Sequence, residues 1–200
     1  MLEARDLECR RGGRPLFGGL SLTLNPGELL RVAGANGSGK TSLLRILCGL
    51  LTPEAGEVRW KGTAIRALRE EYARELVYLG HAPAVKDDLT AAENLKYACV
   101  FAGLSSTEIG SSIERFGVPA DVPIKKLSQG QKRRAALARL ALSQQVPLWL
   151  LDEPFAALDA AAAGLVEELV RAHAGAGGAV IFTTHQDTRV AATRVIELHA

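Results

Sequence analysis

One short stretch of the chain has the residue types and spacing of a phosphate-binding loop. Residues 34–41 fit the pattern G-x-x-x-x-G-K-[ST], in which glycines let backbone N–H groups curl around phosphate oxygens. In this pattern the lysine reaches the β- and γ-phosphates of a nucleotide, and the hydroxyl after it faces Mg²⁺. We therefore expect nucleotide binding by Gly34, Ala35, Asn36, Gly37, Ser38, Gly39, Lys40, Thr41 and Ser42.

The sequence on either side of this loop supplies the elements that must position it. Residues 28–33 are typical of a buried strand, and residues 42–47 follow a helical pattern. A strand, a glycine-rich loop and a helix start are the context in which this pattern binds phosphate. The N-terminus of the helix adds positive potential at the phosphates. A glycine-rich turn with an exposed lysine, the alternative, requires neither flanking element.

Two carboxylates follow a second apolar run. Residues 148–151 predict a fully buried strand that ends at Asp152 and Glu153. Ligands of open α/β folds bind at the carboxyl ends of the strands. Asp152 is suited to hold Mg²⁺ there, and Glu153 to orient or deprotonate the water that attacks a γ-phosphate. An acidic turn at the end of a strand is the alternative interpretation.

A third motif points to a particular family. Residues 127–131 read Leu-Ser-Gln-Gly-Gln and precede a basic, alanine-rich stretch. This resembles the signature motif of ATP-binding-cassette ATPases, with Gln129 where the family usually has glycine. The resemblance implies that Ser128 and Gly130, with Gln131 beside them, contact ATP held by a second copy of the chain. A serine at a helix start is also an ordinary N-cap, and we interpret the basic run as a solvated helix face.

The order of these landmarks resembles the same family over essentially the whole chain. Residues 157–159 look like the loop that crosses the dimer interface, which implies a place for Asp159 at the shared site. His185 follows a strand predicted at residues 179–183 and matches the switch histidine that contacts the γ-phosphate. The resemblance implies ATP hydrolysis with Mg²⁺ by a homodimer that forms on ATP binding. Its catalytic residues are then Lys40, Glu153 and His185.

Two positions depart from the usual pattern of the family. His81 lies where the family carries a glutamine that senses Mg²⁺ and touches the membrane partner. An imidazole titrates near neutral pH, and we group His81 with Thr41 and Asp152 on the metal side of the site. Arg11 lies at or next to the position of the aromatic that stacks on adenine. A guanidinium plane can stack on a base, or Arg11 is an ordinary surface arginine, and Phe17 is a further candidate for stacking.

The loop after a strand predicted at residues 75–79 points to one subfamily. Tyr-Leu-Gly-His-Ala-Pro at 78–83 and Lys-Asp-Asp-Leu-Thr at 86–90 are similar to the ATP-binding subunit of the bacterial haem exporter of cytochrome c maturation. The resemblance implies integral membrane transporter subunits as partners and, indirectly, a haem chaperone. It also implies a peripheral place on the cytoplasmic face of the inner membrane. The chain has no haem-attachment motif, so we do not expect it to bind haem itself.

Composition limits the alternatives. With 200 residues, of which 48% are hydrophobic, the chain can bury a sizeable core. A net charge of +2 gives no sign of a nucleic-acid-binding surface. The chain has no apolar run of bilayer-spanning length and no signal-peptide pattern, so we expect a cytosolic chain. The cysteines are far apart and lack a CxxC spacing, so neither disulfides nor a zinc site is expected; they are Cys9, Cys48 and Cys99.

Alternating apolar strands and helices predict the fold class. We expect an α/β P-loop NTPase of ATP-binding-cassette type, with a mainly parallel core sheet, an N-terminal antiparallel β part and an inserted helical lobe. A single domain spans 1–200, with its core at 1–83 and 146–200 and a helical subdomain at about 84–145. Two other functions remain open: a transporter ATPase with other cargo, and a soluble cassette ATPase acting on nucleic acid or ribosomes. Members of the latter group usually carry two cassettes or a long coiled-coil insertion.

Overall fold

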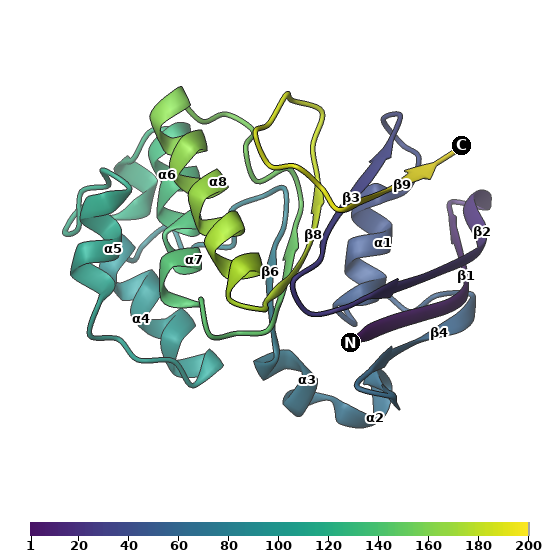
Figure 1. Cartoon of the computed structure of the whole chain (residues 1–200). Coiled ribbons are helices and arrows are strands. Elements are labelled where there is room, and N and C mark those ends of the chain that lie inside the picture. Colours follow the sequence, from purple (N-terminus) through teal and green to yellow (C-terminus); the bar gives the residue numbers. More distant parts are fainter. Residues whose placement is uncertain (200) are drawn as a thin grey trace.

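The computed structural model describes residues 1–199, which form two β-sheets with a helix between them (Figure 1). The antiparallel sheet has the strand order β2-β1-β4-β5, and the parallel sheet has the order β6-β7-β8-β3-β9. The antiparallel strands are β1 (Leu2–Arg11), β2 (Arg14–Leu24), β4 (Ala55–Trp60) and β5 (Thr63–Ala64). The parallel strands are β3 (Leu29–Gly34), β6 (Leu76–Leu79), β7 (Leu148–Leu151), β8 (Ala179–Thr183) and β9 (Arg194–Leu198). The predicted fold class is confirmed.

The helices divide into one between the sheets and a group on the outer face of the parallel sheet. Helix α1 (Lys40–Leu47) lies between the two sheets (Figure 1). Two short helices, α2 (Ile65–Leu68) and α3 (Glu70–Arg74), lead into β6. The remaining helices are α4 (Ala91–Ala102), α5 (Ile109–Arg115), the 3₁₀ helix η1 (Ile124–Lys126), α6 (Gln129–Leu137), α7 (Arg139–Leu142) and α8 (Ala160–Gly175).

The apolar face of α1 is the centre of one hydrophobic core. Leu43, Leu44 and Leu47 are fully buried between the antiparallel sheet and the inner face of the parallel sheet. From the parallel sheet, Leu30 and Leu150 reach the same cluster. Because this helix begins directly after the glycine-rich loop, its burial on both sides fixes the loop relative to the strand ends.

A second core covers the other face of the parallel sheet. Trp149, Leu151 and Phe182 point away from α1 and pack in one cluster with residues from α4 to α8. Gly103 is the C-cap of α4 and Gly117 follows the C-cap of α5, and both glycines have positive φ. The cluster runs without interruption from the sheet into these helices, so the division at about residues 84 and 145 stays a prediction.

Four short elements were not expected from the sequence: α2, α3, β5 and β9. The edge strand β9 pairs with β3 in parallel register, Val195 opposite Arg31. It carries Arg194 and Glu197 and is mostly exposed, so it lacks the apolar run that revealed the other parallel strands.

The register of the parallel sheet brings four strand ends to one edge. Leu79 lies opposite Leu151, and Leu151 lies opposite Phe182. Val32 lies opposite Thr183, so the loops after β3, β6, β7 and β8 emerge side by side. Ligand sites of open parallel sheets form at this edge. Among residues 1–199, no helix is long and apolar enough to cross a membrane.

Candidate functional site

A pocket of about 420 Å³ lies at the carboxyl edge of the parallel sheet. It gathers the predicted phosphate loop, the two carboxylates after β7, the histidine after β8 and the histidine after β6. Its lining residues are Arg11, Leu16, Asn36, Gly37, Gly39, Lys40, Thr41, Ser42, His81, Asp152, Glu153 and His185. Segments that are far apart in the sequence therefore form one concave polar site.

The phosphate loop is built around glycines that no other residue can replace without strain. Gly34 has φ +138°, and a Cβ there would lie 2.5 Å from the carbonyl oxygen of Leu198. The same Cβ would lie 2.7 Å from Ser38 Oγ, which is buried. Gly39, with φ +101°, precedes α1 and offers no side-chain cap, so the N–H groups at the helix start stay available to an anion.

The buried lysine of the loop is held by the loop itself. Lys40 Nζ donates to the carbonyl oxygens of Gly34 at 2.8 Å and Ala35 at 3.0 Å. These bonds satisfy a buried cation that lines the pocket. A phosphate placed over the loop would meet this ammonium group together with the helix N-terminus.

The metal side of the site has the oxygen ligands that Mg²⁺ prefers. Thr41 Oγ1 donates to Asp152 Oδ2 at 2.7 Å, and Thr183 Oγ1 donates to Asp152 Oδ1 at 2.8 Å. Asp152 is only 2% exposed, so its charge lies at the wall of the pocket. A hydroxyl and a carboxylate beside a phosphate site fit a magnesium ion that takes its other ligands from substrate and water. His81 lines the same pocket, and its place on the metal side stays a prediction.

Glu153 faces His185 in an unusual backbone conformation. Its φ is +52°, which residues other than glycine rarely adopt. Its N–H donates to Thr183 Oγ1 at 2.9 Å, and its Oε2 accepts from the His185 N–H at 3.2 Å. His185 Nε2 lies 3.6 Å from Glu153 Oε1. The carboxylate is thus held at the pocket beside the histidine, where a water attacking a phosphate can be oriented.

The two candidates for base stacking lie on the same side of the pocket. Arg11 ends β1 and lines the pocket itself. Phe17 lies against the loop, because a Cβ on Gly39 would be 3.0 Å from Phe17 Cδ1. The choice between these residues stays a prediction.

The signature residues lie outside this pocket. Ser128 caps α6 by accepting from the Gln131 N–H at 3.2 Å, while Gln131 Oε1 accepts from the Ser128 N–H at 2.9 Å. Asp159 caps α8 by accepting from the Ala162 N–H at 2.8 Å. Within residues 1–199, none of Ser128, Gly130, Gln131 and Asp159 lines the pocket. This placement suits residues that act on the site of a second copy, a role that stays a prediction.

The basic run after the signature is not a solvated helix face, as the sequence had suggested. Arg133 is only 6% exposed and donates to four backbone carbonyl groups, including those of Asp152 and Glu153. Lys132 Nζ lies 3.4 Å from Asp87 Oδ1. The loops after β6 and β7 cover Arg133. Thr183 was also missed, although a polar residue ending the apolar strand β8 is a usable signal.

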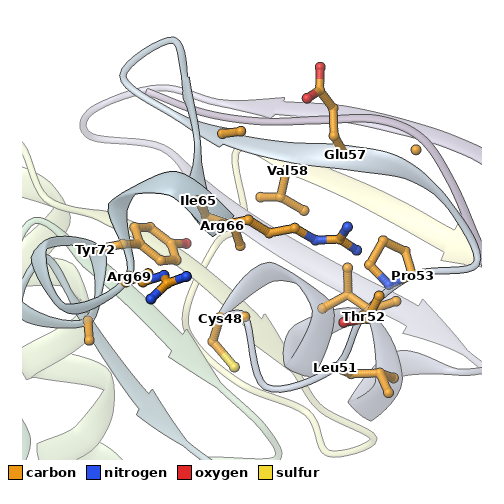
Figure 2. A pocket seen from close by; sticks show the side chains of 15 residues that line it. Cys48, Leu51, Thr52, Pro53, Glu57, Val58, Ile65, Arg66, Arg69 and Tyr72 are labelled. Atoms are coloured by element: carbon orange, nitrogen blue, oxygen red, sulfur yellow. The ribbon is translucent and has the colours of Figure 1, made fainter.

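A second pocket, of about 410 Å³, lies at the opposite end of α1 (Figure 2). In this view Arg66 reaches toward Pro53, and Arg69 lies between Tyr72 and Cys48. Tyr72 Oη donates to the Leu47 carbonyl at 2.7 Å, which ties α3 to the end of α1. Among residues 1–199, none of those expected to bind nucleotide lines this second pocket. The chemistry predicted from the sequence therefore belongs to the first pocket.

Comparison with known proteins decides the family. Residues 17–156 match the family described as ABC transporter. The chain belongs to the ATP-binding-cassette (ABC) transporter family. This cassette is 55% identical over 191 residues to the cytochrome c biogenesis ATP-binding export protein CcmA of Aromatoleum aromaticum, covering 94% of this chain and 89% of that protein. It is 50% identical over 202 residues to the CcmA of Dechloromonas aromatica, with 99% and 98% covered.

Solved structures agree with this assignment. The cassette superposes with a TM-score of 0.85 and 25% identity on a dimeric ATP-binding cassette in a post-hydrolysis state with ADP and Pi bound. That alignment covers 99% of this chain and 94% of the other. The ATP-binding subunit of another ABC transporter gives a TM-score of 0.84 at 25% identity, over 92% and 79% of the two chains. The cassette is an ABC-type ATPase.

Proposed function

We propose that this cassette is the ATP-hydrolysing subunit of a membrane transporter complex that exports haem for cytochrome c maturation. One observation carries the proposal: a single pocket holds the lysine, hydroxyl, carboxylates and histidine of a nucleotide-hydrolysing site. Relatives named as cytochrome c biogenesis export proteins match this chain at 46–55% identity and support the choice of cargo system. An ABC subunit with other cargo is the alternative.

The roles of the pocket residues follow from their positions. Lys40 and the N–H groups of residues 34–41 bind the β- and γ-phosphates. Glu153 orients or deprotonates the attacking water, and His185 contacts the γ-phosphate from the β8 side. The 3.6 Å separation of His185 Nε2 and Glu153 Oε1 leaves both within reach of one water. Arg11 supplies the surface on which the base stacks.

The donor set at Thr41 and Asp152 supports a place for Mg²⁺. When bound, the ion neutralises charge on the phosphate oxygens. His81 lies on the same side and senses the ion or its water through the imidazole. The chain itself fixes the carboxylate from both sides, with hydrogen bonds of 2.7 Å and 2.8 Å, so little rearrangement is needed when the ion arrives.

Two copies complete each site. Ser128, Gly130 and Gln131 of one copy cover the γ-phosphate bound to the other, and Asp159 lies at the interface. ATP joins the pair because both copies contact one γ-phosphate; hydrolysis removes this bridge and the dimer opens. Integral membrane subunits change state with it on the cytoplasmic face of the inner membrane. A haem chaperone takes part indirectly.

Covalent haem staining of c-type cytochromes tests the proposal directly. In cells whose only copy carries Glu153→Gln, we expect the stained cytochromes to be lost while the apoproteins are still made. Glu71→Gln, at an exposed carboxylate on α3, is the matched control and should stain normally. Normal staining in the Glu153→Gln cells would overturn the haem-export proposal and favour a transporter with other cargo.

A further inference from the structure

The buried guanidinium group of Arg133 joins three segments around the candidate site. Arg133 is a residue of α6, and its side chain extends between the ends of β6 and β7. Nη1 donates to the carbonyl oxygens of Gly80 and His81, both at 3.0 Å. Nη2 donates to the carbonyl oxygens of Asp152 at 3.2 Å and Glu153 at 2.6 Å. One side chain therefore ties the signature helix to the loop of His81 and to the loop of the two carboxylates.

The geometry requires an arginine. Burial lowers the pKa of the guanidinium, while the charges of Asp152 and Glu153 act in the opposite direction. A cation that is only 6% exposed is stable only where its N–H groups are hydrogen-bonded. A guanidinium presents donors in a rigid plane and can serve two loops at once, whereas a lysine ammonium is a single point on a flexible stem.

Arg133 acts on a constrained backbone unit of the site, the peptide groups of Glu153. Glu153 has φ +52° and is held at both ends of its backbone. Thr183 Oγ1 accepts from its N–H at 2.9 Å, and Arg133 donates to its carbonyl oxygen at 2.6 Å. The direction of the Glu153 side chain toward His185 depends on this conformation. A displacement of Arg133 would therefore reach the carboxylate that orients the water.

The N-terminal end of α6 carries the signature, and Arg133 lies in the middle of the helix. Ser128 is the N-cap of this helix, and Arg133 follows five residues later, roughly 7 Å along the helix axis. The helix is short and continuous between them. A shift of the signature when it engages a nucleotide must move Arg133 as well.

We propose that Arg133 is a positioning residue that couples engagement of the signature to the placement of Glu153 in its own copy. The inference rests on the proposed two-copy site. When Ser128 contacts ATP held by the partner, α6 moves as a unit and Arg133 resets the Asp152–Glu153 and Gly80–His81 loops. Each copy thereby adjusts its own hydrolytic carboxylate in response to the ATP bound by the other.

The neighbouring lysine provides a matched control. Lys132 belongs to the same helix and pairs with Asp87 at 3.4 Å, outside the pocket. Asp87 lies six residues after His81 in the same connection between β6 and α4, but among the hydrogen bonds of residues 1–199 Lys132 reaches none of the four carbonyl groups that Arg133 holds. Loss of its charge removes a cation from the same helix while the hydrogen bonds to the ends of β6 and β7 remain.

Steady-state hydrolysis by the full chain, assembled with its membrane subunits, tests the coupling. The variants are Arg133→Gln, Arg133→Lys and Lys132→Gln, compared with wild type for ATP Kd, kcat and the Hill coefficient for ATP. In Arg133→Gln we expect the Kd to stay within about twofold while kcat falls at least about tenfold and the Hill coefficient falls toward one. Arg133→Lys should show the same split, because one ammonium cannot serve both loops. Lys132→Gln should match wild type.

Three results would overturn the inference: an unchanged kcat, a Kd that rises in step with the loss of kcat, or a fall in kcat with an unchanged Hill coefficient. The second would mean a purely structural role, and the third a local role without coupling. If Arg133→Gln does not fold, Arg133→Lys decides by the same criteria. Absence of hydrolysis in the wild-type complex would instead contradict the proposed function, so the two failures are distinguishable.

Discussion

The Thr183 hydroxyl donates a hydrogen bond of 2.8 Å to the Asp152 carboxylate. The same hydroxyl oxygen accepts from the Glu153 N–H at 2.9 Å, and Thr41 holds the second Asp152 oxygen at 2.7 Å. One threonine at the end of β8 thus positions both acidic residues at the end of β7. The carboxylates are fixed in the chain before any ligand arrives, which lowers the reorganisation needed for catalysis.

Replacing this threonine should therefore weaken both stability and turnover. Thr183→Val keeps the shape but leaves a buried carboxylate oxygen and a backbone N–H without a partner, at a cost of about 1–3 kcal/mol. We expect the unfolding midpoint in urea to fall and kcat to fall with it. Thr183→Ser keeps the hydroxyl and should recover most of the kcat. Equal kcat values for the two variants would contradict this role of the hydroxyl.

The proposed base gives a sharper separation of binding from chemistry. Glu153→Gln preserves size and backbone contacts but removes the negative charge that activates water. We expect ATP binding to remain and kcat to fall at least about 100-fold, as is typical for loss of a general base. Fluorescent-nucleotide titration and phosphate release measure the two quantities on one sample. Wild-type turnover in this variant would refute the assignment of Glu153.

Much of this site could be predicted from the sequence because its residues sit at the ends of strongly patterned elements. The glycine loop follows an apolar strand, and Asp152 ends the fully apolar strand β7. The end of such a strand can be predicted because the apolar pattern stops at a polar residue. The parallel register then brings the strand ends together. The local sequence is therefore enough to predict which residues these are and at which strand ends they lie.

Arg133 could not be predicted in the same way. Its partners are backbone carbonyl groups from two loops 52 and 53 residues before it and 19 and 20 residues after it. Every residue has a backbone carbonyl group, so the sequence does not show which of them accept hydrogen bonds from a side chain. A basic residue after a helix start is most often solvated. The edge strand β9 was missed for a related reason, since its stability comes from pairing with β3 rather than from apolar residues.

The lysine of the phosphate loop offers a direct test of nucleotide binding. Lys40→Ala removes the buried ammonium that lies 2.8 Å from the Gly34 carbonyl, and with it the main cation facing the phosphates. We expect ATP affinity to fall at least about tenfold in equilibrium titration. Lys61→Ala, at an exposed lysine that pairs with Glu75, is the control and should bind ATP normally. Unchanged ATP affinity in Lys40→Ala would contradict the phosphate-loop interpretation.

Mixing two inactive variants tests whether the signature acts on the other copy. Lys40→Ala and Ser128→Arg should each abolish hydrolysis when present in both copies. A mixed dimer has one site with an intact Lys40 and an intact Ser128, because these residues come from different copies. We expect turnover to reappear on mixing, measured as phosphate release at fixed total protein. If both residues served the same copy's site, the mixture would stay inactive.

His173, which lies outside the nucleotide site, should make the free energy of unfolding depend on pH. Its ring stacks on Trp149 with centroids 3.9 Å apart, and Nδ1 lies 3.2 Å from the Gln144 carbonyl oxygen. Burial lowers the pKa of His173 to about 4, whereas the unfolded chain has the ordinary value of 6.5. Between these values the unfolded state binds the proton and the folded state does not, so the free energy of unfolding falls as pH drops from 6.5 toward 4.

The loss from this group alone amounts to at most about 3 kcal/mol, and above the unfolded pKa the group contributes no pH dependence. Thermal unfolding at pH 7.5 and about pH 5 measures the effect as a fall in Tm. His173→Gln cannot titrate, so its Tm should change less between the two conditions even if the variant is less stable overall. The comparison is between slopes, because other carboxylates also titrate below pH 5. An equal fall in Tm in both proteins would mean that folding does not lower the pKa of His173. The stack on Trp149 would then tolerate the charged ring.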